Sequence, residues 1–225
     1  MEKIRILLLF LLFLCFSTSA FAEENNDDNK GISIGISGLF GTNTLDTSNV
    51  VEEYEPGFIA GGGITLQKIL AKYMSAGTGL EYRYFEFEFN YFDNDTSAEI
   101  DAVWEFQAIS VPFHLIATIK GPSSSLDLHA GMTYTYIFSS EMVTKDDLSS
   151  GIKTDDVMRF TSPSQIAVSG GVILRFAVTT YSDFFMGIMT EYYFTDLLNL
   201  SHDNEKIHLL NYSFNTGYML RTDLF

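Results

Sequence analysis

Cysteine is almost absent from this sequence. Its one cysteine, Cys15, lies in an apolar stretch near the N-terminus, and Leu14 stands before it where a lipoprotein signal requires a small residue. Once that stretch is cleaved, the mature chain has no thiol, which excludes disulfide bonds and cysteine metal sites. We therefore expect backbone pairing and packing to stabilise the protein without a cofactor or a bound metal.

Long apolar runs are equally scarce. The run near the N-terminus covers residues 6–16, follows Lys3 and Arg5, and is closed by small residues around Ala20 and Ala22. This order is typical of a secretory signal peptide, so we predict that residues 1–22 are removed by cleavage after Ala22. The run is shorter than the ~20 residues that a membrane-spanning helix needs, and no second run is long enough. The sequence therefore predicts no transmembrane helix.

Basic residues are few. The full chain holds 29 acidic and 13 basic residues. Removing Glu2, Lys3 and Arg5 with the signal peptide leaves 28 acidic and 11 basic residues, a mature net charge of −17. Residues 23–30 form an acidic N-terminal tail. A negative charge of this size disfavours binding to nucleic-acid phosphates, and about 200 residues fit one domain.

The mature chain consists largely of segments in which apolar and polar residues alternate, the pattern of β-strands. Eight such segments cover residues 32–40, 58–66, 73–87, 104–119, 126–138, 165–176, 184–194 and 210–222. Each is about as long as the 9–11 residues that a tilted strand needs to cross a bilayer. Long and short connections alternate between them, as in up-and-down barrels of the bacterial outer membrane. We predict an all-β fold, an eight-stranded antiparallel up-and-down transmembrane β-barrel over residues 31–225, with both chain ends in the periplasm.

The two faces of these segments differ in chemistry. Leu80 and Tyr82 lie on an apolar face, whereas Glu81 and Arg83 lie on a face of small, polar or charged residues. A soluble lipocalin-like barrel or sandwich would bury the apolar face. We expect that face to meet lipid instead, because aromatic residues gather at the strand ends as in a membrane-interface girdle. The expected girdle beside the long connections is Phe40, Phe58, Tyr84, Phe85, Phe87, Trp104, Phe106, Tyr136, Phe138, Tyr192, Tyr193, Phe194, Tyr212 and Phe214.

Tyr84 and Phe85 are consecutive aromatics, which interrupts the alternation of that segment. We expect a β-bulge there that turns Phe85 and Phe87 toward lipid. Glu86 and Glu88 would then belong to an acidic outer rim.

Charged side chains are expected inside the barrel, where space is limited. Eight strands enclose an interior that side chains fill, and buried charges are costly unless they are paired. We therefore predict a closed lumen, with a narrow or gated channel as the alternative. The predicted polar network comprises Glu81, Arg83, His114, Asp127, His129, Arg175, Glu191 and Arg221.

Catalytic chemistry is not expected. Ser110, His114 and His129 could serve a lipid-modifying enzyme in principle, but general acid-base catalysis needs a histidine where substrate can reach it. Both histidines fall in the middle of predicted strands, on the inward face. We therefore predict no catalytic residue.

One acidic connection, residues 93–101, has oxygen ligands at alternate positions, as calcium-binding loops do. It lacks the glycine and the bidentate glutamate of such loops, because Ala98 and Trp104 stand at those positions. We therefore favour a solvated acidic loop. The alternative hypothesis is that the loop binds a divalent cation weakly. The ligands would be Asp93, Asp95, Glu99 and Asp101.

Several short motifs resemble a known family. They are Pro56-Gly-Phe-Ile-Ala-Gly-Gly62, Gly77-Thr-Gly-Leu-Glu-Tyr82, Ile109-Ser-Val-Pro112, Leu126-Asp-Leu-His-Ala-Gly131 and the terminal Phe225. They are similar to the bacterial outer-membrane β-barrel family that includes PorT-like proteins and small OmpA-like or porin-like barrels. The chain departs from this family at Ser110, where an acidic residue is usual.

The resemblance implies a cell-envelope protein, most of whose relatives have no assigned activity. Its expected partners are outer-membrane lipid, lipopolysaccharide and the barrel-insertion machinery, which would read the C-terminal strand ending at Phe225. We expect a monomer that acts as a structural or surface-interaction protein through acidic external loops, with an external ligand that the sequence does not name. A component of a PorT-like secretion or envelope assembly is the alternative.

Overall fold

The alternating segments form antiparallel strands. The computed structural model describes residues 31–47, 54–93, 98–146, 151–197 and 207–222. The long strands are β1 (Ile32–Thr47), β3 (Gly57–Ala71), β4 (Met74–Asp93), β5 (Ala98–Lys120), β6 (Ser124–Asp146), β8 (Ser164–Thr179), β9 (Ser182–Tyr193) and β10 (Ile207–Thr222). Two short strands, β2 (Tyr54–Glu55) and β7 (Gly151–Asp156), and one 3₁₀ helix, η1 (Met158–Phe160), complete the described elements.

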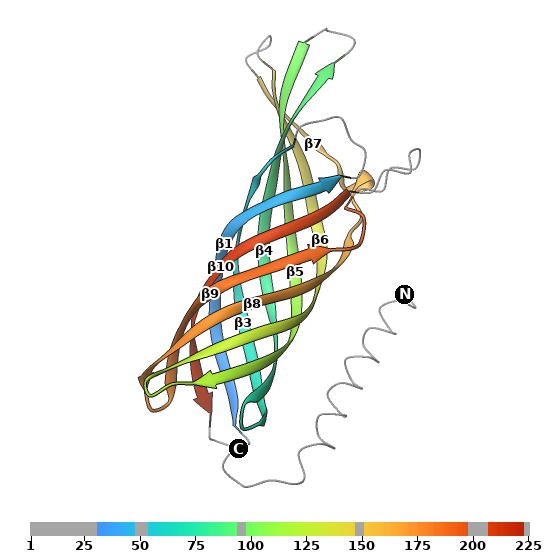
Figure 1. Cartoon of the computed structure of the whole chain (residues 1–225). Helices are drawn as coiled ribbons and strands as arrows, with labels where there is room; N and C mark the ends of the chain where they lie inside the picture. The colour runs from blue at the N-terminus through green and yellow to red at the C-terminus, as the bar shows by residue number, and fades with distance from the viewer. Residues whose placement is uncertain (1–30, 48–53, 94–97, 147–150, 198–206, 223–225) are drawn as a thin grey trace.

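The long strands close into a barrel (Figure 1). Each pairs with its neighbours along the chain, and β10 returns to β1, where Thr222 lies opposite Ile32. The predicted eight-stranded antiparallel barrel is therefore confirmed. Among the described residues, no helix is long and apolar enough to cross a membrane.

The two ends of the barrel differ. Short turns at residues 72–73, 121–123 and 180–181 lie at one end, together with the start of β1 and the end of β10; we call it the turn end. At the opposite end, which we call the loop end, the strands lead into the long connections, and β4, β5 and β6 continue past the wall (Figure 1). From Glu86, Glu105 and Glu141 outward, these strands join β2 and β7 in what we call the projecting sheet, which includes these three residues.

The projecting sheet corrects a prediction. Residues 88–103 were expected to form a connection, but β4 and β5 pair through most of that segment, with Phe89 opposite Ala102 and Asp93 opposite Ala98. The alternation of aromatic and polar residues continues after Phe87, so the ladder continues with it. The thickness of a bilayer sets how many residues a strand needs to cross it. A strand can still continue beyond the bilayer into water.

The outer wall exposes large aliphatic side chains. Leu80 and Leu115 are each 57% exposed, Ile188 is 63% and Ile36 is 66% exposed. Soluble monomers rarely expose apolar patches that extend around a molecule. The alternative of a soluble lipocalin-like barrel or sandwich is therefore excluded, because such a fold requires this face to be buried.

The inner face near the loop end is apolar, against expectation. Phe85, Phe87, Phe106 and Tyr193 are at most 2% exposed, so their assignment to the lipid girdle was wrong. The expected bulge at Tyr84 is absent, because the ladders of β4 with β3 and β5 run through it without a register shift. Phe85 and Phe87 therefore stay on the same inward face as Glu81 and Arg83.

A bulge lies elsewhere. Gln107 is opposite Ser139 and Ala108 is opposite Ile137, which leaves Phe138 on β6 without a partner in the β5 ladder. Phe138 remains exposed, while Ile137 and Ser140 on either side of it are buried. The extra residue shifts the inward phase of β6 by one position at the level where β6 leaves the wall.

Close strand contact at Gly131 gives a test of this register. An added Cβ at Gly131 would overlap the carbonyl oxygen of Phe113, a backbone atom, whereas at Gly38 the nearest atom would be 3.9 Å away. We expect Gly131→Ala to lower the free energy of unfolding by about 1–3 kcal/mol, the usual cost of overpacking. Urea titration, followed by the faster migration of folded barrels on unboiled gels, measures the loss. Gly38→Ala is the matched control and should be neutral; equal effects of the two would contradict the register.

Candidate functional site

Side chains fill the lumen in layers, and the layer nearest the loop end is apolar. Three phenylalanine rings form its centre: Phe106 stacks on Phe85 with centroids 5.0 Å apart and meets the Phe87 ring edge-on at 5.7 Å. We call this layer the apolar plug. It consists of Leu39, Ile59, Phe85, Phe87, Phe106, Ala108, Ile137, Ala167, Tyr193, Leu197, Ile207 and Leu209. All are buried, so the plug separates the lumen from the loop end.

Below the plug, Arg83 bridges two carboxylates on opposite sides of the lumen. Its Nε and Nη2 donate to Glu81 on the same strand at 3.0 and 2.6 Å. Its Nη1 and Nη2 donate to Glu191 on β9, the latter at 3.1 Å. The guanidinium fork suits such bidentate pairing. All three residues are at most 7% exposed, so this is a buried ionic cluster.

Neutral groups complete the bonding of this cluster. The Tyr193 hydroxyl accepts a bond from Arg83 at 3.1 Å and donates one to Glu191 at 3.3 Å, and Thr133 donates to Glu191 at 2.8 Å. Asn211 donates to Glu191 at 3.4 Å. These donors matter because two carboxylates share one guanidinium, and buried charges destabilise a fold unless they are fully bonded. Tyr193 was missed by sequence reasoning, although it has the same parity as Glu191 in an unbroken strand.

A second charged cluster lies toward the turn end. Arg175 donates to Asp127 at 2.5 Å and to Gln67 at 2.7 Å. Arg221 donates to both carboxylate oxygens of Asp183 at 2.8 Å. Asp183 lies 3.8 Å from Arg175 and so links the two pairs.

Asp183 was expected in a short turn, yet it is 1% exposed. It lies inside because β9 begins at Ser182, which gives Asp183 the inward parity of Glu191. The missed signal was that the alternation of this strand begins before its first aromatic residue.

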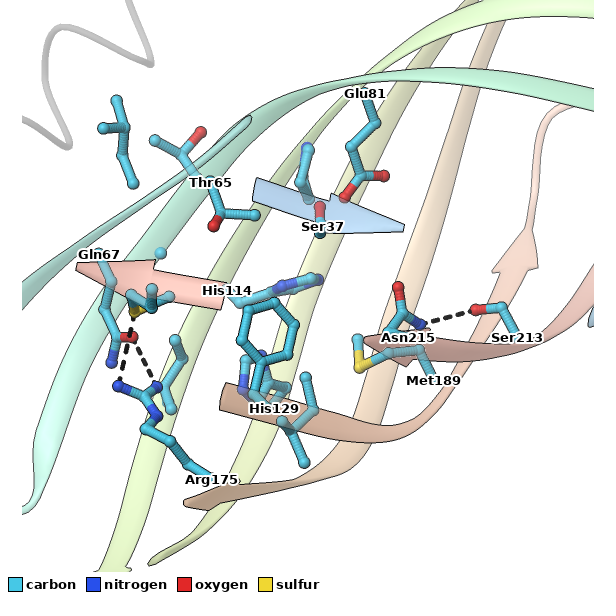
Figure 2. A pocket seen from close by; sticks show the side chains of 18 of the residues that line it. Ser37, Thr65, Gln67, Glu81, His114, His129, Arg175, Met189, Ser213 and Asn215 are labelled. Carbon is cyan, nitrogen blue, oxygen red and sulfur yellow. Dashed lines mark hydrogen bonds between the residues drawn. The ribbon is translucent and has the colours of Figure 1, made fainter. Parts of the chain in front are cut away.

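A cavity of about 80 Å³ lies between the clusters, and His114 and His129 line it (Figure 2). Their rings are 5.6 Å apart, edge to face. His114 Nε2 is 2.8 Å from Ser169 Oγ, while neither ring nitrogen of His129 has a partner in the described part of the chain. Ser110 bonds Thr135 at 2.7 Å rather than either histidine. A cavity of this size with polar side chains in its lining can hold water that bonds His129.

The structure therefore divides the predicted lumen residues into groups. Glu81, Arg83 and Glu191 form one cluster. Asp127, Arg175 and Arg221 join the other through Asp183. His114 and His129 lie between the clusters without bonding a charged residue in the described chain.

The predicted divalent-cation residues are not in one loop. Asp93 ends β4, while Glu99 and Asp101 lie in β5, with Asp101 opposite Asn90. Asp95 lies outside the described residues, as do Phe225, the predicted signal peptide and the acidic tail. Within the described ranges, no group of His, Asp or Glu side chains is arranged to hold a metal ion.

The barrel resembles solved outer-membrane proteins. OprG from Pseudomonas aeruginosa superposes with a TM-score of 0.55 at 10% identity, over 86% of this chain and 96% of that chain. The chain has the fold of a small outer-membrane β-barrel. A major outer membrane protein from Thermus thermophilus superposes with a TM-score of 0.48 at 11% identity, over 84% of this chain and 99% of that chain. Neisserial surface protein A superposes with a TM-score of 0.46 at 10% identity, over 84% of this chain and 96% of that chain. No family model matches this sequence, and no curated protein sequence matches it.

Removing Arg83 tests the central cluster of this outer-membrane barrel fold. We expect Arg83→Met to lower the free energy of unfolding by about 3–5 kcal/mol, because Glu81 and Glu191 would be left buried without a cation. Adding Glu81→Gln and Glu191→Gln removes both charges and should recover most of the loss. Urea unfolding in detergent micelles gives the three stabilities.

Arg159→Met is the matched control, since Arg159 is exposed on η1. It should leave the unfolding midpoint unchanged. A triple variant no more stable than Arg83→Met would mean that unpaired charge is not the cause of the loss.

Proposed function

We propose that the protein is integral to the bacterial outer membrane, has a closed lumen, and binds a cationic partner through an acidic surface at its loop end. One observation carries the proposal: the lumen is filled, while the strands at the loop end extend into an acid-rich projecting sheet. The apolar outer wall fits lipid and lipopolysaccharide. The turn end then faces the periplasm and the loop end faces outside, in the arrangement usual for such barrels.

A filled lumen argues against transport. The apolar plug contains three mutually packed phenylalanine rings. Below it, Arg83 joins β4 to β9 across the interior. An ion would have to pass the apolar plug and then displace a fully bonded guanidinium. The channel alternative is therefore disfavoured.

We expect no stable unitary conductance when the purified protein is inserted into a planar bilayer. A known open porin recorded under the same conditions is the control for insertion. Stable, large conductance steps from this protein would overturn the closed-lumen proposal.

The projecting sheet concentrates carboxylates in one row. Glu86 lies opposite Glu105, Glu105 opposite Glu141, and Glu141 opposite Asp156, across β4, β5, β6 and β7. Directly opposed residues lie on the same face of a sheet, and like charges there destabilise it. We call this the acidic row. A row that costs stability and attracts cations fits a surface that binds a basic partner.

Neutralising the acidic row should weaken binding and strengthen the fold. We expect Glu105→Gln with Glu141→Gln to lower the affinity for a short oligolysine probe and to reduce the salt dependence of binding, because fewer opposite charges meet. Unfolding of this variant should need more urea, since the like-charge contacts are removed. Fluorescence anisotropy in detergent micelles measures the binding.

Asp46→Asn with Asp196→Asn is the matched control. It makes the same charge change at the loop end without touching the acidic row. It should retain most of the affinity. Equal weakening by both variants would point to net charge rather than to the row.

Other functions have less support. A secretion or envelope assembly rests on the PorT-like resemblance alone and stays a prediction, because fold similarity does not determine function. A lipid-modifying enzyme is disfavoured, since the His114–Ser169 pair lies inside the lumen below the plug. Binding of Phe225 by the insertion machinery and a monomeric state also stay predictions.

A further inference from the structure

The turn end of the barrel opens into a cavity of about 350 Å³. Basic side chains from separate parts of the wall line it: Lys72 from a turn, Lys120 from β5, Arg175 from β8 and Arg221 from β10. Hydroxyl groups of Ser33, Ser75, Thr118, Ser123, Ser124 and Ser125 also line it, together with the carboxylate of Asp183 and apolar residues such as Ile69 and Met74. We call this cavity the basic vestibule. Its volume falls in the range of small-molecule sites.

The basic vestibule keeps an excess of positive charge. Arg175 and Arg221 are paired with Asp127 and Asp183. Lys72 and Lys120 have no carboxylate partner in the described part of the chain, so both charges are uncompensated there. Lys72 lies 5.2 Å from the centre of the Tyr73 ring, a cation–π contact. Such an excess contrasts with the strong net negative charge of the chain.

A layer of bonded side chains forms the floor of the basic vestibule. Arg175 bonds both Asp127 and Gln67, and Arg175 and Gln67 also line the histidine cavity above. A ligand entering from the turn end meets this bonded layer before it reaches the histidine cavity. The vestibule has the form of a blind receptor site rather than the mouth of a channel.

One donor of the vestibule, Arg221, is held in place before any ligand arrives. Asp183 binds Nε and Nη2 of Arg221, which fixes the guanidinium plane and leaves Nη1 without a partner among the described residues. The Arg221 side chain is 47% exposed, so that group is accessible. Pre-positioned donors bind more tightly because less side-chain entropy is lost.

We propose that the basic vestibule binds a multivalent anion carrying phosphate or carboxylate groups. Lys72, Lys120 and Arg221 supply charge and N–H donors, and the serine hydroxyls supply further donors. This inference goes beyond the proposed function, because the vestibule lies at the opposite end from the acidic row.

Two sources share this chemistry. One is a free phosphate-class anion in the compartment that the turn end faces. The other is the acidic tail, which carries Glu23, Glu24, Asp27 and Asp28 and joins the wall at Gly31. The Gly31 carbonyl accepts a bond from Ile69 N at 3.4 Å, and Ile69 lines the vestibule. The tail therefore starts at the rim of the site, where a tethered segment has a high effective concentration.

Inorganic pyrophosphate is the probe. We expect calorimetry of the mature protein in detergent micelles at low salt to show binding that Lys72→Gln or Lys120→Gln each weakens about tenfold, the value of one charged hydrogen bond. Lys68→Gln is the matched control, because Lys68 is exposed at the same end but does not line the vestibule. It should change affinity little. Migration on unboiled gels checks that each variant is folded.

Deleting residues 23–30 separates the two sources. If the tail occupies the site, deletion strengthens pyrophosphate binding, and a synthetic peptide of residues 23–30 competes with the probe. If a free anion is the ligand, deletion leaves the affinity unchanged and both lysine variants still weaken it. The proposal is overturned if neither the mature nor the tail-deleted protein binds pyrophosphate, or if Lys68→Gln weakens binding as much as the vestibule variants do.

Discussion

Closure of the hydrogen-bonded ladder is the constraint on which the rest of this structure depends. A wall that faces hydrocarbon has no water to bond its backbone groups, so every strand needs a partner on both sides. Pairing of β10 with β1 supplies the last of these partners. Closure also fixes which side chains point inward, because side chains alternate along every strand. The apolar outer wall and the charged interior are two results of the same alternation.

A closed ring of few strands leaves an interior that must be filled, and the chain fills it in two chemically different ways. Near the loop end the apolar plug packs without polar side-chain atoms apart from the Tyr193 hydroxyl, which points to the ionic cluster. Farther down, Arg83 on β4 bonds Glu191 on β9, and Arg175 on β8 bonds Gln67 on β3. Bonding across the lumen joins strands that share no ladder, so the charged clusters tie the wall together from inside.

The ends of the barrel carry opposite charge. Opposed carboxylates of the acidic row crowd the loop end, whereas Lys72, Lys120 and Arg221 surround the vestibule at the turn end. The carboxylates of the acidic row face one another, and Lys72 and Lys120 have no carboxylate partner in the described part of the chain, so each end keeps uncompensated charge. We interpret the two ends as separate binding surfaces for ligands of opposite charge. The filled lumen between them prevents passage from one to the other.

The sequence by itself determined the strands, the closed barrel and the inward direction of Glu81 and Arg83, because alternation has a fixed period and a shift by one residue would expose these charges to lipid. It did not determine that Phe85 and Phe106 turn inward, since an aromatic residue near a strand end suits either the interface or the interior. Only the tertiary structure decided that choice, by leaving the β4 ladder unbroken and placing a bulge at Phe138. It also decided that Arg83 meets Glu191 and that Arg221 meets Asp183, because such partners lie far apart in the chain and meet only through the register of the closed ring.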